Sequence, residues 1–213
     1  MKITTIIIGL LLILLAAIAD PPPAHQSSTD RIATLEVRIE ALEKQLNPLL
    51  QQQKNLNKAR KEPARARQRI LADNDRYTRE ELHSIEILYK QAALDWTNPE
   101  AKEILQTLQA RFPKANRTGC ALLRYSLQLA NDEKIDYLQH LVQHYSNCYF
   151  PDGVHVGSFA RLTLSLAYRK VGNSSAAEKQ INVLRQTHPH AIDHHGRLLL
   201  DHLDDLEAIL PHP

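Results

Sequence analysis

Six Ile and Leu residues at alternating intervals of three and four constrain this chain more than any other feature, because that spacing is typical of a coiled-coil seam. They are Ile32, Leu35, Ile39, Leu42, Leu46 and Leu49. The pattern continues weakly through Gln53 and Leu56, so we expect a coiled coil over residues 30–56, with Pro48 as a kink or an end. A stripe this narrow encloses no core of its own, which favours self-association. Because Ile and Leu are mixed along the seam, a dimer and a trimer both stay open, as does packing of this helix on the chain's own globular part.

A continuous apolar run precedes the seam and covers residues 3–19. It ends in Ala17-Ile18-Ala19, small residues of the kind a signal peptidase reads, and three prolines follow at 21–23, which cannot continue a helix. We expect a cleaved signal peptide over 1–19 and a Pro-rich extended segment over 20–29. The alternative is an uncleaved membrane anchor, since about 20 apolar residues span a bilayer. The expected location is a bacterial periplasm, without stable membrane insertion after cleavage.

Basic residues cluster directly after the seam. Residues 54–69 carry seven bases against one acid, Glu62, although the whole chain has a net charge of only +2. We expect a basic linker over residues 57–76 that forms a solvated connecting helix, interrupted at Pro63, with contact to an acidic partner or a lipid surface as alternatives. The absence of interleaved aromatic residues and the expected export argue against nucleic acid as a partner.

From Tyr77 onward, apolar residues recur with a helical period and turn signals separate the segments. A capping box begins at Thr78, and Asn98-Pro99 supplies a cap and a first-turn proline for the next helix. Further helices are expected at about 119–131, 134–146, 158–171, 175–187 and 191–209. No useful stretch alternates with a period of two. The predicted fold class is therefore all-α.

The expected hairpins end at regular places. Pro113, Ser146 and Pro189 lie 33 and 43 residues apart, and the insertion at 147–157 accounts for the longer interval. Counting back from Pro189 places Ala177 at 12 residues and Tyr168 at 21. This arrangement resembles the tetratricopeptide repeat over residues 79–189. The resemblance implies a short α-solenoid of three helical hairpins over 77–190, followed by a capping helix and tail over 191–213.

The resemblance also implies a partner-binding groove, because the first helix of each hairpin lines the concave face of such arrays. The polar residues on those helices are Glu86, Lys90, Arg124, Gln128, Arg161 and Arg169. Their Arg bias suits an acidic or extended peptide segment. Two positions depart from the family pattern, since Lys134 stands where Ala is expected and Ala92 where Tyr is expected.

The order of signal, coiled coil, basic linker and hairpins resembles that of the periplasmic coordinators of the bacterial Tol-Pal envelope system. That resemblance implies a non-enzymatic, self-associating adaptor that binds a protein partner in envelope organisation or cell division. A periplasmic chaperone, or a secretion or assembly factor, is the alternative that uses the same groove.

The two cysteines are expected to meet. Cys120 begins one helix of the second hairpin and Cys148 follows the end of the returning helix, so both fall at the open end of the pair. In an exported protein this placement predicts a structural disulfide. A redox pair and two free thiols are the alternatives.

Histidines are dense near the C-terminus, with five of the eleven inside residues 188–202: His188, His190, His194, His195 and His202. The spacing of His190 and His194 would suit a metal if both lay on one helix face. Surface or structural histidines are the preferred interpretation, because no ordered metalloprotease pattern, phosphate loop, dinucleotide fingerprint or nucleophile elbow is present. We therefore expect no enzyme activity, no cofactor and no metal, with a His-rich metal-binding protein or a hydrolase as the second alternative.

Overall fold

The computed structural model describes residues 28–201 and 203, and this part of the chain is all-helical apart from turns and two isolated β-bridges. The all-α prediction is confirmed for these residues. The predicted signal peptide over 1–19 and most of the Pro-rich segment lie outside them, as do His202 and the tail 204–213. The chain divides into two compact units, Met1–Gln51 and Gln52–Pro213.

The described part of the first unit is the beginning of α2 (Ser28–Ala59), a helix of 32 residues. This helix continues through Pro48, so the proline does not end it. The Lys, Gln and Leu residues on either side are good helix formers, and the helix resumes after the one backbone hydrogen bond that proline removes. All six seam residues are solvent-exposed, from 57% at Ile32 to 37% at Leu49. Pairing along the seam stays a prediction.

The end of α2 belongs to the second unit and is packed there. Leu56 and Ala59 form a small apolar cluster with Ile192 and Leu198. Leu56 was expected as a weak continuation of the seam, but its side chain contacts its own unit instead. The exposed apolar stripe therefore ends near Leu49.

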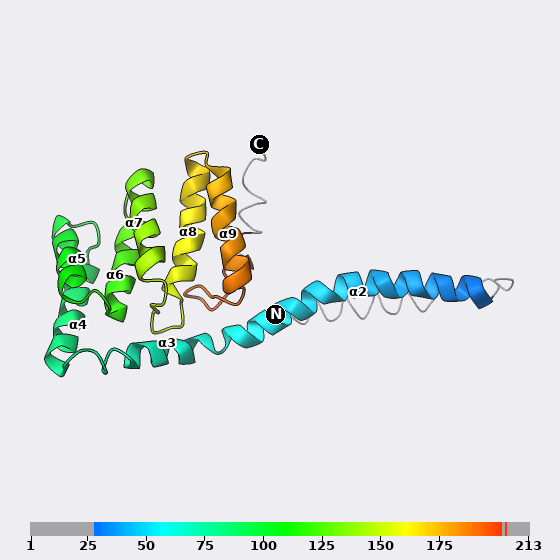
Figure 1. Cartoon of the computed structure of the whole chain (residues 1–213), viewed down its shortest axis with the longest axis horizontal. Coiled ribbons are helices and arrows are strands. Elements are labelled where there is room, and N and C mark those ends of the chain that lie inside the picture. Colours follow the sequence, from blue (N-terminus) through cyan, green and yellow to red (C-terminus); the bar gives the residue numbers. More distant parts are fainter. Residues whose placement is uncertain (1–27, 202, 204–213) are drawn as a thin grey trace. The chain divides into compact units, whose positions relative to one another are not determined.

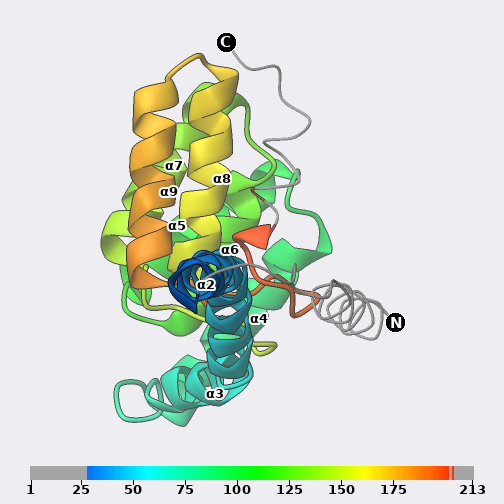
Figure 2. The same cartoon turned by 90° about the vertical axis from the view of Figure 1, so that its right-hand side faces the viewer.

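Three helical hairpins make up most of the second unit, as Figure 1 shows. They are α4 (Arg79–Leu94) with α5 (Pro99–Arg111), α6 (Asn116–Ser126) with α7 (Asn131–His144), and α8 (Val156–Lys170) with α9 (Ser174–Thr187). The expected capping box at Thr78 and the Asn98 cap are both present. The last hairpin turns at Gly172, whose φ of 77° favours glycine. Figure 2 shows α8 and α9 packed side by side.

One continuous core runs through the three hairpins. Leu105, Leu122, Leu138 and Leu164, one from each of four helices, are no more than 1% exposed and belong to the same cluster. A second cluster joins α8 and α9 to the C-terminal segment through residues such as Leu199. The hairpins are thus held to one another by burial of leucines on the faces that the helical period predicts.

Helix α3 (Glu62–Leu71) lies below the ends of the hairpins in Figure 1, and its side chains reach segments that follow the first and the third hairpin. Arg69 donates to the carbonyl of Lys114 at the first hairpin, and Arg65 contacts His190 at the third. Ala66 is fully buried between them. The predicted basic linker therefore contains a packed helix with Pro63 in its first turn, rather than only a solvated connection.

The expected helix at 191–209 is wrong over residues 191–200, which form turns and the bridge between Ile192 and Leu198. Asp193 explains the difference, because its Oδ1 accepts hydrogen bonds from the backbone N–H groups of His195 and Arg197. Gly196 follows with a φ of 76°. This Asp-led turn competes with the helix that the leucine spacing favours.

Candidate functional site

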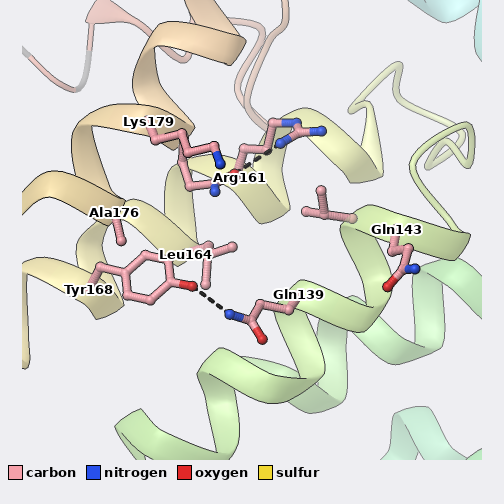
Figure 3. A pocket seen from close by; sticks show the side chains of 9 residues that line it. Gln139, Gln143, Arg161, Leu164, Tyr168, Ala176 and Lys179 are labelled. Carbon is pink, nitrogen blue, oxygen red and sulfur yellow. Dashed lines mark hydrogen bonds between the residues drawn. The ribbon is translucent and has the colours of Figure 1, made fainter. Parts of the chain in front are cut away.

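An open pocket of about 440 Å³ lies against α7, α8 and α9 (Figure 3). Its polar side chains come from all three helices. Its apolar part is formed by Val142, Leu164 and Ala176. The polar lining residues are Gln139, Gln143, Arg161, Tyr168, Lys179 and Gln180.

Hydrogen bonds hold the polar side chains of this pocket in place. The Gln139 amide donates to the Tyr168 hydroxyl, and Arg161 Nη1 donates to Gln180 Oε1 over 2.9 Å. Both bonds are drawn in Figure 3. Arg161 and Gln180 lie 19 residues apart and meet because α9 returns along α8.

The pocket is positively charged. Burial lowers the pKa of Arg161, but a guanidinium remains protonated at any ordinary pH. Lys179 adds a second, exposed cation, and none of the nine lining residues is acidic. A pocket with two cations, amides that can donate and accept, and a small apolar floor is suited to a carboxylate on an extended chain.

The six residues predicted to form one groove lie in different surroundings. Glu86 and Lys90 form an ion pair on α4, and Glu86 also pairs with Arg117 of α6 over 2.9 Å. Gln128 is exposed in the turn after α6 rather than on that helix, and Arg169 lies in the last turn of α8. Of the six, only Arg161 lines the pocket of Figure 3.

Arg124 contacts the C-terminal segment. Its Nη2 lies 3.2 Å from His194 Nε2, and its guanidinium stacks over the Phe150 ring at 5.0 Å. His194 in turn contacts Asp152 over 2.6 Å. The side of α6 that was expected to receive a ligand is therefore partly covered by the chain's own residues.

The pocket residues on α9 were missed by the sequence analysis. Lys179 and Gln180 carry no motif, and the resemblance drew attention to the first helix of each hairpin instead. Their helical position opposite Arg161 could have been found by pairing the two helices of the third hairpin residue by residue.

A second polar cluster lies where α3 meets the hairpin ends. Glu62 is only 2% exposed, and its carboxylate contacts Arg65 and lies 3.3 Å from His190 Nε2. His188 stacks on His155 at 4.4 Å, and His155 Nδ1 lies 2.7 Å from the Ser158 hydroxyl. These contacts tie the third hairpin to α3.

The buried His155 makes stability depend on pH. Burial lowers its pKa to about 3, and the nearby groups that act in the same direction are all basic: His188, His190, Arg161 and Arg65. An unfolded histidine titrates near 6.5, so between pH 6.5 and 3 the unfolded chain binds a proton that the folded chain excludes. The contribution of neutral His155 to the free energy of unfolding is therefore fully present above about pH 6.5 and is lost as the pH falls below it.

We expect His155→Asn to remove about 2 kcal/mol of the stability loss between pH 7 and pH 5. Asn preserves the helix cap, because His155 caps α8 by accepting from the Ser158 N–H. Urea unfolding at both pH values measures the effect, and the exposed His83→Asn is the control. The raised pKa of Glu62 acts in the opposite sense above pH 4.5, but Glu62 is present in both proteins, so the difference between them isolates the contribution of His155. An equally steep loss in His155→Asn and the unmodified protein would contradict the prediction.

Both cysteines are buried, free thiols in the structure. Cys120 lies on α6 and Cys148 follows α7, so the expected convergence at one hairpin end is present. Burial raises the pKa of Cys148 to about 11 and that of Cys120 well above its usual value. Because the thiolate is the reactive form, the folded protein should oxidise slowly, and the predicted bridge would form before the hairpin closes.

We expect protein from an oxidising compartment to carry the Cys120–Cys148 bridge. A closed loop of about 29 residues corresponds to roughly 3.5 kcal/mol of stabilisation in the chain-entropy model. Alkylation without reduction, followed by mass spectrometry, distinguishes the two states. Two labelled thiols after denaturation would refute the bridge.

The described residues offer little support for a metal site or for a catalytic serine and histidine. His190 and His194 do not share a helix face, since residues 190–194 form a turn region, and within residues 28–201 and 203 no group of three or more His, Cys, Asp or Glu could hold a metal ion. Ser158 and His155 pair closely but are 1% and 4% exposed, and they cap α8. No helix in the described part of the chain has the length and apolar character that a membrane span requires.

Comparison with protein-family models, curated proteins and solved structures found no match to this chain. The function of the protein is therefore inferred from its residues and their geometry.

Proposed function

We propose that this protein is a non-enzymatic, self-associating scaffold of the bacterial envelope, and that it binds an acidic segment of a protein partner in the pocket between α7, α8 and α9. The observation that carries the proposal is the combination of Arg161 and Lys179 with three glutamines over an apolar floor, in a pocket without an acidic residue.

The hairpins are proposed to form a tetratricopeptide-like array. Ala101 and Ala177, which stand where that repeat has a small residue, are 2% and 0% exposed. Tyr168 reaches the preceding hairpin through Gln139, and the Tyr125 and Tyr137 rings lie 5.5 Å apart within the second hairpin. The Tyr168–Gln139 contact supports packing of the third hairpin on the second, and the Tyr125–Tyr137 contact supports packing of the two helices within the second hairpin.

Self-association is proposed to occur through the exposed stripe of α2. Six apolar side chains that repeat every 3.5 residues and stay 37–57% exposed are suited to bury against the same stripe of another chain. Two or more pockets in one assembly would then raise a weak affinity for a multivalent partner.

The pocket is tested with labelled ten-residue peptides of alternating Ala and Glu, and of alternating Ala and Lys, by fluorescence anisotropy. We expect micromolar, salt-sensitive binding of the acidic peptide only. Arg161→Glu with Lys179→Glu should weaken it at least tenfold, because two attractions become repulsions. Lys102→Glu with Lys170→Glu adds the same charge outside the pocket and should cost much less.

Equal binding of both peptides, or equal loss in both double variants, would overturn the pocket as the binding site. A periplasmic chaperone remains the alternative use of the same surface. It would differ by binding unfolded chains of any charge and by suppressing their aggregation.

A further inference from the structure

In the folded protein, the basic segment after the seam exposes most of its bases but buries the acids between residues 52 and 74. Between residues 52 and 74 the chain has two acids, Glu62 and Asp73, and they are 2% and 5% exposed. Glu62 is paired with Arg65, and Asp73 with Arg69 over 2.6 Å. Folding therefore takes both acids of residues 52–74 out of solvent and pairs each with an arginine, while Arg65 itself and Asp75, the next acid along the chain, stay exposed.

The remaining bases of the segment stay in solvent. Five of them have exposed side chains and no exposed acid among them, namely Lys54, Lys58, Arg60, Lys61 and Arg67. They belong to the end of α2, the following turn and α3, which lies below the ends of the hairpins in Figure 1. We call this set the basic surface. These five exposed side chains are all positively charged, whereas the sequence of the segment also contains two acids, which are buried.

A cationic pocket lies at the C-terminal end of α3. It has a volume of about 420 Å³, and its lining includes Arg69, Arg76, Lys114 and His144. The Arg69 and Arg76 guanidinium groups both approach the Lys114 carbonyl, at 2.9 and 3.4 Å. Since Asp73 is engaged by Arg69 and by the Asn116 N–H, the pocket keeps an excess of positive charge.

We propose that the basic surface docks the hairpin unit on an anionic lipid bilayer, with a headgroup phosphate entering the pocket beside Arg76 and Lys114. Juxtaposed lysines and arginines bind anionic membrane surfaces with roughly additive strength. Leu71 is 55% exposed at the C-terminal end of α3 and supplies an apolar side chain for the headgroup layer. Binding of the hairpins to a protein partner does not use this surface, so the two proposals stand separately.

A lipid surface is favoured over a nucleic acid by the side chains that accompany the bases. No aromatic residue lies between positions 52 and 74 to stack on a base, whereas Leu71 is placed for contact with lipid. If the apolar run at 3–19 is retained as an anchor, it also holds the chain beside a membrane.

The test is sedimentation of the full chain with vesicles of phosphatidylcholine alone or with 30% phosphatidylglycerol. The ratio of the two partition coefficients is the readout, because the apolar run contributes to both. We expect a ratio above about 10, falling towards 1 in 0.5 M NaCl. Lys58→Gln, Arg60→Gln and Arg67→Gln together should lower the ratio at least tenfold. The matched control changes three other lysines to Gln, namely Lys102, Lys134 and Lys170. These lysines lie near the ends of the hairpins that point away from α3.

Circular dichroism verifies that both triple variants keep their helices. An equal ratio for the two variants, or a ratio near 1 for the unmodified chain, overturns the proposal. So does displacement from vesicles by 10 mM inorganic phosphate at constant ionic strength, which would indicate a site for free anions. Tighter binding of a DNA duplex than of the anionic vesicles, lost in the same variant, would assign the surface to nucleic acid instead.

Discussion

Replacing Ile39 and Leu46 by Glu should convert the protein from an oligomer into a monomer. Both side chains lie on the exposed stripe of α2, at 54% and 45% exposure. Burying two carboxylates in each helix of a coiled-coil interface would cost several kcal/mol, which exceeds what a seam of six residues supplies. Light scattering at tens of micromolar protein measures the mass directly.

The matched control places two Glu residues on the same helix away from the seam, at the exposed positions Ala33 and Ala41. It should keep the oligomer. If the unmodified chain is already a monomer at this concentration, the seam has no partner of its own kind. A deletion that tests the same point should end at residue 51, because Leu56 and Ala59 pack within the hairpin unit.

Local signals predicted most of the helices, because each carries its boundary in the sequence. Thr78 and Glu81 each accept a hydrogen bond from the other's backbone N–H, and Asn98 accepts from the Glu100 N–H, while Pro99 has no N–H to satisfy. Such contacts depend on the nearest neighbours in the chain, so a single sequence contains them. The starts of α6, α7 and α8 lie two or three residues before the expected positions, since Ala115 and Ala130 provide no side-chain cap and His155 is an unusual one.

The helix expected at 191–209 was wrong over residues 191–200 because it was predicted from the spacing of leucines alone. Leu198, Leu199 and Leu203 are buried as expected, but in an irregular segment and not on a helix over 191–200. Asp193 followed by Gly196 was a visible turn signal that outweighed the apolar spacing.

Contacts between distant segments set the surroundings of the functional residues, and most of these contacts have no local signal in the sequence. Glu62 is buried by contacts to residues more than 80 positions away, among them His190. Arg161 was identified as a candidate, but its partner Gln180 depends on how α9 returns. The expected solvated connecting helix is therefore packed on one side, and most of its exposed charged residues are basic.

Replacing Gly119 by Val should destabilise the hairpin unit by about 3 kcal/mol and lower its melting temperature by roughly 6 to 12 °C. A Cβ at this position would lie 2.5 Å from Cys148 Sγ and 2.8 Å from Cys148 Cβ. Glycine is therefore required because α6 passes directly against the residue that follows α7. The exposed Ala110→Val on α5 measures the helix-propensity cost of valine, which is about 0.5 kcal/mol.

A second substitution separates this clash from a general loss of packing. Cys148→Ala removes the sulfur but leaves the Cβ, so it should recover part of the loss when combined with Gly119→Val, although alone it creates a cavity and destabilises. Thermal unfolding of the four proteins gives the coupling between the two positions. Additive losses would show that the helix can shift away from Cys148. The same close approach brings Cys120, the next residue on α6, towards Cys148, so a shift of this kind would also weaken the case for the predicted disulfide.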